Sequence, residues 1–99
     1  MFIDQNWMLG DLVKVPGVRH ALVLTADGLV KLRSDSLSDE VAERLAAAGA
    51  SLSSVSQSVA HEHGTSDRPP RQVMVEFDGA ILFIRGAGDG SHLAVIAEP

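Results

Sequence analysis

The clearest pattern in the chain is an apolar residue at every third or fourth position across its middle. The positions are Leu37, Val41, Leu45, Ala48, Leu52, Val55 and Val59. Residues at this spacing share one face of an α-helix for about six turns. Ser36 and Ser38 precede most of the run and have the type of side chain that helix N-caps favour. The pattern predicts a long helix that lays one apolar stripe on a sheet.

The same segment has a second flank of small side chains. The flank consists of Ala42, Ala46, Gly49, Ala50 and Ser53. No charged residue occurs at the fifteen positions 46–60, although solvated helix faces generally carry several. Small side chains let another backbone approach closely, whether it belongs to a sheet or to a second helix. We expect the stripe to cover the sheet and the small flank to meet a second copy. A glutamate at Ala46 or Ala50 should then separate the subunits.

Five further segments have the composition of β-strands. They are Val18–Thr25, Leu29–Arg33, Arg71–Phe77, Ala80–Arg85 and Ser91–Ala97. Asp27-Gly28 and Asp78-Gly79 are tight-turn signals that join two pairs of them into hairpins. The last two segments are apolar on both faces, so the sheet needs cover above and below.

A shorter helix through Trp7–Val13 precedes the strands and ends before Pro16. The predicted order of elements is therefore αββαβββ. This is an α+β fold, a five-stranded antiparallel sheet with helices on both faces. With 99 residues, 45% of them hydrophobic, the chain fits one packed domain over residues 1–99.

The charge balance narrows the class of partners. Eight Lys/Arg against thirteen Asp/Glu give a formal net charge of −5, which argues against nonspecific binding to nucleic acid or to an anionic membrane. The lack of cysteine excludes disulfides, and no apolar run approaches the roughly 20 residues of a membrane span. The first residues lack the features of a secretory signal. We expect a cytoplasmic protein with no nucleic-acid partner and no membrane insertion.

No group of residues has the spacing of a catalytic or cofactor site. His61 and His63 are two apart with no third ligand nearby, so a solvated helix end explains them better than a metal. Gly86, Gly88 and Gly90 precede a strand rather than the helix that a phosphate-binding loop needs. We therefore predict a protein that is not an enzyme and has no cofactor and no metal.

A small-molecule sensor of the profilin or PAS type is an alternative, because such sensors also have a central sheet. They hold their ligand in a roomy interior pocket with a few inward polar groups. The predicted strands offer Arg19, His20 and Glu76 as candidates for that role.

Two hairpins carry a resemblance to a known family. The segment VRHALVLTADGL at residues 18–29 resembles the first hairpin of the Roadblock/dynein light-chain family. The segment QVMVEFDGAILF at residues 72–83 resembles its later hairpin. Both are most similar to the actinobacterial Roadblock proteins that are encoded with a small Ras-like GTPase. The resemblance covers nearly all of the chain, and its motifs are structural rather than catalytic.

The resemblance implies a function. Domains of this family dimerise, with their long helices and third strands meeting across a two-fold axis, which adds Val73 and Val75 to the expected dimer interface. They bind small GTPases or serve as scaffolds, and some bacterial members act as GTPase-activating dimers without an obvious arginine finger. The resemblance thus implies a non-enzymatic homodimer that binds or regulates a small Ras-like GTPase in a signalling complex.

The sequence departs from the family at its C-terminal end. Family members usually have a further helix after the last strand, where it shares a sheet face with the first helix. This sequence ends at Glu98-Pro99, so we expect that helix to be absent.

Overall fold

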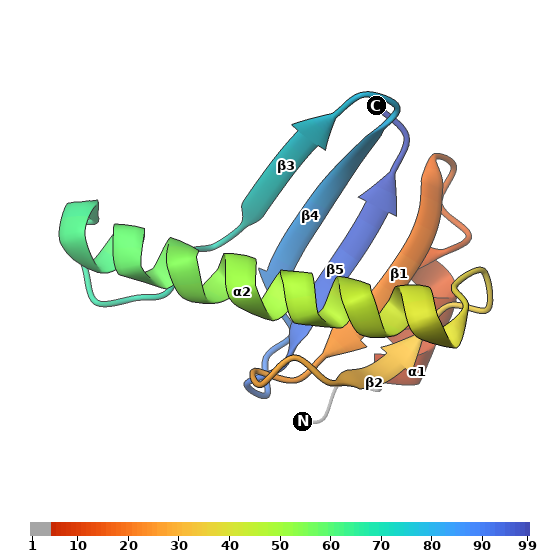
Figure 1. The fold of residues 1–99 in the computed structure, drawn as a ribbon, viewed down its shortest axis with the longest axis horizontal. Helices are drawn as coiled ribbons and strands as arrows, with labels where there is room; N and C mark the ends of the chain where they lie inside the picture. The colour runs from red at the N-terminus through yellow and green to blue at the C-terminus, as the bar shows by residue number, and fades with distance from the viewer. Residues whose placement is uncertain (1–4) are drawn as a thin grey trace.

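The structure, a computed structural model, describes residues 5–99 and contains two helices and five strands within them (Figure 1). They are α1 (Gln5–Leu12), β1 (Val18–Leu24), β2 (Val30–Arg33), α2 (Asp39–His63), β3 (Val73–Phe77), β4 (Ala80–Gly86) and β5 (His92–Ala97). Their order along the chain confirms the αββαβββ pattern that the sequence predicts.

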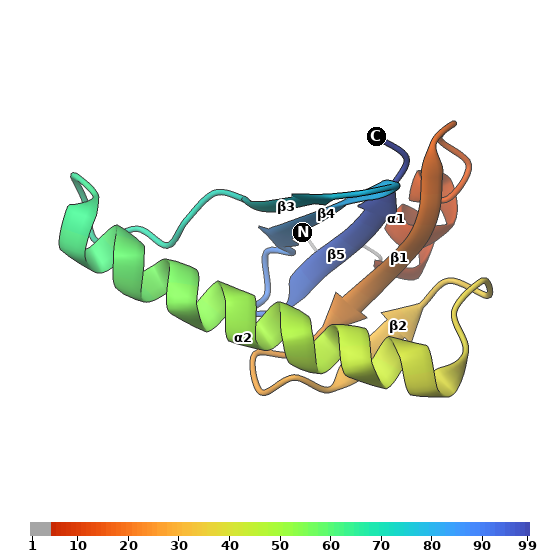
Figure 2. The ribbon, with the colours of Figure 1, turned by 45° about the horizontal axis from the view of Figure 1, so that its top comes forward.

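The five strands form one antiparallel sheet in the order β2-β1-β5-β4-β3. Pairing of β1 with β5 joins the first hairpin to the last three strands, so β2 and β3 become the two edges. Gly28 and Gly79 adopt positive φ angles of 88° and 89° in the hairpin turns, a conformation that glycine accepts without steric penalty. The α+β fold class is confirmed, with α2 on one face of the sheet and α1 on the other (Figure 2).

The boundaries of α2 follow from its capping residues. Ser38 is the N-cap, and its side chain accepts a hydrogen bond from the N–H of Val41 at 3.3 Å. α2 continues to His63, about one turn beyond Val59, the last apolar residue of the predicted helix pattern. The reason is that Gly64 is the first residue with a strong tendency to end a helix, and it forms the C-cap.

The small residues of α2 face the sheet, which reverses the predicted orientation of this helix. Ala42, Ala46 and Gly49 are buried. Ala42 and Ala46 belong to one core cluster with the large side chains of the sheet, among them Leu22 and Leu24 of β1. Much of the stripe predicted to cover the sheet points to solvent instead.

Side-chain volume explains this orientation. The sheet supplies the bulk of the core, because β1 and β4 direct leucine and isoleucine side chains at α2. A helix that packs closely on such a surface needs small residues, since protein interiors are filled to crystal-like density. The alanines and Gly49 therefore allow close approach to the chain's own sheet rather than to a second helix.

The other helix, α1, covers only part of the opposite face. It packs on β1 and β2, where Leu9, Ala21 and Val23 form a second buried cluster. Side chains of β3, β4 and β5 that alternate away from α2 lie on the same side of the sheet, beyond α1. They include Met74, Ile81, Phe83 and Val95, which we call the bare sheet face. Among residues 5–99, α1 packs mainly on β1 and β2 (Figure 2). Met74 is exposed, and Ile81, Phe83 and Val95 are half-buried.

Candidate functional site

An exposed apolar surface runs along the side of α2 that faces away from the sheet. Val41, Val55 and Val59 are 43%, 63% and 54% exposed, and Ala48 is exposed between them. At about 100° per residue these four residues lie in one narrow sector of the helix, and we call them the α2 stripe. Positions 46–60 contain no charge, so on α2 the neighbours of Val55 at helical spacing are uncharged, while Arg44 flanks Val41 and Ala48 and Glu62 follows Val59. Exposed apolar surface of this kind marks interaction sites.

The edge strand β3 lies beside the C-terminal half of α2. It pairs with β4 on one side, and its other edge has no partner strand among residues 5–99. In both ribbon views the end of α2 extends past this edge (Figures 1 and 2). An open strand edge is a template for pairing with another chain. The α2 stripe and the β3 edge therefore give this side of the molecule two features that suit a protein partner.

The residues predicted for a dimer interface do not share one exposed surface. They are Ala42, Ala46, Gly49, Ala50, Ser53, Val73 and Val75. The first three are buried under the chain's own sheet, and the other four are half-buried. The side chains of Val73 and Val75 pack against the core under α2, although the backbone edge of β3 is open. The exposed apolar side chains of α2 are instead those of the α2 stripe.

A cavity of about 320 Å³ lies beneath the C-terminal half of α2, on the side opposite the α2 stripe. Segments far apart in the sequence line it: α2, the connection before β3, and the ends of β4 and β5 with the loop between them. Its volume is at the lower end of the range for small-molecule sites. The sequence contains no local signal for it, because the cavity exists only where these segments meet.

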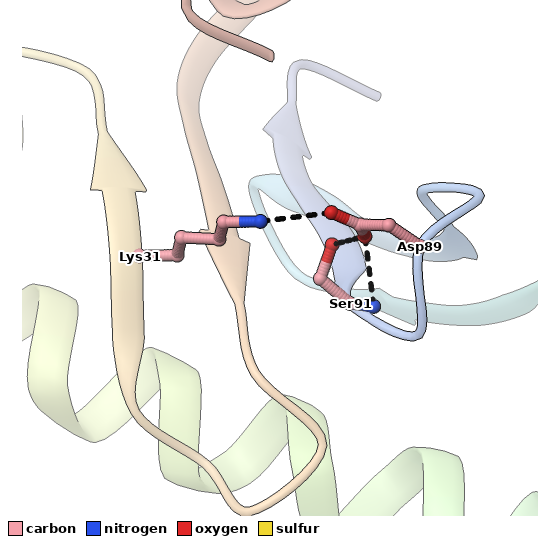
Figure 3. Close-up of polar contacts among 3 residues, drawn as sticks. All are labelled: Lys31, Asp89 and Ser91. Atoms are coloured by element: carbon pink, nitrogen blue, oxygen red, sulfur yellow. Dashed lines mark hydrogen bonds and ion pairs between the residues drawn. The ribbon is translucent and has the colours of Figure 1, made fainter. Parts of the chain in front are cut away.

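A polar cluster anchors the loop between β4 and β5 to the edge strand β2 (Figure 3). Lys31 Nζ donates to Asp89 Oδ2 at 2.8 Å, and the N–H of Ser91 donates to Asp89 Oδ1 at 3.1 Å. The Ser91 hydroxyl also donates to Oδ1. The hydrogen bond from Lys31, followed by those from Ser91, holds the pKa of Asp89 well below its usual value.

A register shift explains how Lys31 reaches across β1. Val23 pairs with Leu32 and Leu24 pairs with Val30, so Lys31 is an extra residue in β2. Such a bulge redirects the side chain of the extra residue. The Lys31–Asp89 pair has no local signal in the sequence, because the two residues are 58 positions apart.

The other candidate groups do not assemble into a site. Within residues 5–99, no three His, Asp or Glu side chains are placed to hold a metal, and His63 lies 3.8 Å from Glu62. No helix in this range is both long enough and apolar enough to cross a bilayer. Of the polar strand residues, Arg19 lies 4.0 Å from Glu98, and His20 Nδ1 is 2.7 Å from a serine hydroxyl. Glu76 is exposed on the edge strand β3, so these three strand residues do not converge.

Comparisons with known proteins agree on one family. Residues 5–97 match the family model of the Roadblock/LC7 domain. A Roadblock/LC7 domain structure from Streptomyces avermitilis is 36% identical, with a TM-score of 0.87 over 97% of this chain and 79% of that chain. A second Roadblock/LC7 structure from that species is 33% identical, with a TM-score of 0.72 over 98% of this chain and 81% of the other.

More distant structures share the fold. The structure of Myxococcus xanthus MglB is 16% identical and has a TM-score of 0.83 over 98% of this chain and 77% of that one. The gliding protein MglB of Thermus thermophilus is also 16% identical, with a TM-score of 0.81 over 99% and 76% of the two chains. No curated protein matches the chain in sequence.

Proposed function

Because the chain belongs to the Roadblock/LC7 domain family, we propose that it is a non-enzymatic regulatory or scaffold module. In this proposal it works in the cytoplasm as a homodimer that binds or regulates a small Ras-like GTPase in a bacterial signalling complex. The family resemblance supports the GTPase partner, and the exposed surfaces of the chain support the dimer.

The observation that carries the proposal is the α2 stripe beside the open edge of β3. Full burial of an exposed valine side chain contributes roughly 1.5 kcal/mol or more, and each copy of the chain offers three valines with about half of that surface still to bury. In a two-fold interface the same patch meets itself, so two stripes and two β3 edges are brought together at once. Continuous pairing of the β3 edges also satisfies backbone groups that an isolated chain leaves to water.

The GTPase partner is tested by affinity capture. The tagged protein is incubated with an extract of its own cells, with and without a non-hydrolysable GTP analogue, and bound proteins are identified by mass spectrometry. We expect a Ras-like GTPase to be enriched among the bound proteins, and its amount to differ between the samples with and without the GTP analogue. Enrichment that is absent in both conditions, while the dimer is intact, contradicts the GTPase part of the proposal.

The cavity beneath α2 favours a second candidate function, a small-molecule sensor of the profilin or PAS type. Sensors of this type enclose their ligand within the domain, whereas this cavity lies at one end of the sheet. The three polar strand residues that a sensor could use, Arg19, His20 and Glu76, are not among its lining residues. The regulatory dimer is therefore the better supported function.

A further inference from the structure

The cavity beneath α2, which we call the α2 cavity, has an apolar wall. Pro69 and Pro70 of the connection before β3 line it, together with Val73 of β3 and Ile84 of β4. Ile84 is 2% exposed, so this wall is continuous with the core. A wall of this kind suits the hydrocarbon part of a small ligand.

A glycine at the end of β4 leaves room beside this wall. Gly86 lines the α2 cavity, alternates with Ile84 and pairs with His92, so its position faces α2. A β-carbon built on Gly86 would have no heavy atom within 4 Å, and its φ is not among the positive values that favour glycine. A larger residue would therefore fit here. A glycine that the fold itself does not require is typical of a strand position that a ligand approaches closely.

Three polar side chains of the α2 cavity have no protein partner. Ser53 and Gln57 come from α2, and His92 comes from β5. His92 alternates with Ala94, which packs under α2, so its imidazole lies on the cavity side of the sheet. None of the three side chains forms a hydrogen bond with another of residues 5–99, although Ser53 and His92 are half-buried. Their donors and acceptors are therefore available to a ligand.

Among the described residues, no side chain of Lys, Arg, Asp or Glu is directed into the α2 cavity. Arg85 contributes to the lining, but it alternates with Ile84 and pairs with Leu93 of the cluster under α1, so its side chain lies on the other face of the sheet. The carboxylate of Asp89, on the loop between β4 and β5, is bonded to Lys31 (Figure 3). A charged ligand would lose water here without gaining a partner of opposite charge, so the cavity favours an uncharged one.

From these features we infer that the α2 cavity binds a small uncharged ligand, a flat ring that carries a carboxamide. The ring lies against the proline wall, in the room that Gly86 leaves open. The carboxamide both donates and accepts hydrogen bonds, as do the side chains of Gln57 and Ser53 that face it. This inference does not depend on the proposed GTPase partner, because the cavity and the α2 stripe lie on opposite sides of the helix.

Benzamide is a suitable probe, with benzoate and acetamide as matched comparisons. Benzoate has nearly the same shape but is charged, and acetamide has the amide without the ring. Each is titrated into the isotope-labelled full chain while the backbone amides of Gly88 and Gly90 and the side-chain amide of Gln57 are followed by NMR. We expect saturable shifts with benzamide, with a dissociation constant of about 1 mM, and much weaker responses to the other two.

Variants assign the response to the cavity. Gly86→Leu fills the cavity from the sheet and Ser53→Leu fills it from α2, and each should weaken benzamide binding by at least about tenfold. Ser54→Leu is the matched control, because Ser54 is the next residue of α2, is exposed and does not line the cavity. It should leave binding unchanged. Gln57→Leu removes the amide from an exposed position and should also weaken binding by about tenfold.

The two filling variants act from opposite walls, and urea unfolding shows whether each is folded, so a folding defect in one leaves the other as the test. Three results overturn the inference. The first is the absence of a saturable response to benzamide. The second is an equal response to benzoate or to acetamide, since the site then selects neither an uncharged group nor a ring. The third is equal binding of benzamide by Ser53→Leu and Ser54→Leu, which places the ligand outside the cavity.

Discussion

Gly49 of α2 lies so close to Leu24 of β1 that a β-carbon built on the glycine would stand 3.1 Å from Leu24 Cδ2. Leu24 is fully buried, so it has little room to move away. This contact fixes which side of α2 faces the sheet. It also explains why a glycine is present in the middle of a long helix, where it costs about 1 kcal/mol relative to alanine.

Substitution of Gly49 tests that contact. We expect Gly49→Val to lower the free energy of unfolding by about 1–3 kcal/mol or more, because the added methyl groups overpack the core. Ala47→Val is the matched control, since Ala47 lies two residues earlier in the same helix, is exposed and is not part of the α2 stripe. Ala47→Val should change the free energy of unfolding by no more than about 0.5 kcal/mol. Urea unfolding of both variants measures the difference, and equal losses would show that Gly49 does not face the sheet.

Much of the fold could be predicted from the sequence because the signals are local. The steps of three and four between Leu37 and Val59 predict a helix, and the Asp-Gly pairs predict the hairpin turns. The orientation of α2 could not be predicted in the same way. Large residues usually face the core, but here Leu22 and Leu24 of the sheet already fill it. The volume that remains for the helix is set by residues far away in the chain.

The pair formed by Lys31 and Asp89 predicts a pH dependence. The pKa of Asp89 is lowered in the folded state, so its contribution to stability is present above the unfolded-state pKa of about 3.9 and is lost as pH falls below that value. Asp89→Asn should therefore be less stable than the wild type at pH 7, and the difference should shrink towards pH 3.

Urea unfolding at several pH values measures this difference, and the side chains are exposed enough that it should also shrink in high salt. Lys31→Met is the companion variant, because it removes the same ion pair from the other side. A difference between Asp89→Asn and wild type that stays constant from pH 7 to pH 3 would rule out this role for the carboxylate.

The bare sheet face predicts binding of a hydrophobic dye. Met74 is 55% exposed, and its half-buried neighbour Phe83 lies on β4, beyond the two strands on which α1 mainly packs within residues 5–99. We expect the native protein to enhance the fluorescence of an anilinonaphthalene dye, and the double change Met74→Gln with Phe83→Gln to reduce it. If the native protein neither enhances the fluorescence of the dye nor associates through this face, the bare sheet face is not an accessible apolar surface.

The loop between β4 and β5 predicts an absence of nucleotide hydrolysis. Gly86, Gly88 and Gly90 lead into β5, and no helix N-terminus follows them to hold a phosphate. The purified protein should release no phosphate from GTP or ATP above the buffer background in a coupled assay. Turnover that co-purifies with the protein and disappears in Gly88→Ala would show the prediction to be wrong.

Less of the candidate site than of the fold could be predicted from the sequence. The sequence shows that the α2 stripe is an apolar face, but whether that face is buried depends on the sheet that α2 packs against. The Lys31–Asp89 pair joins residues far apart in the sequence beside a bulge in β2, and the cavity beneath α2 depends on segments that only the tertiary fold brings together. None of these features follows from a local pattern.

The two sides of α2 should respond differently to an added charge. Ala46 is fully buried, so Ala46→Glu places an unpaired carboxylate in the core and should lower stability by at least about 3 kcal/mol. The loss is measured by urea unfolding and by circular dichroism. If Ala46→Glu keeps the stability of the wild type and only lowers the molar mass in solution, Ala46 faces a second copy of the chain rather than the sheet.

The most direct test of the proposed dimer is the molar mass of Val55→Glu by light scattering. Val55 is 63% exposed, so the glutamate should be tolerated in the single chain but should stand near its own copy in the dimer. We expect the wild type to be a dimer at tens of micromolar. The dissociation constant of the Val55→Glu dimer should be about a hundredfold higher, with the circular dichroism spectrum unchanged. Leu29→Glu, at a residue 62% exposed on the β1–β2 hairpin, should remain a dimer. A monomeric wild type, or a Val55→Glu variant of unchanged mass, contradicts the proposal.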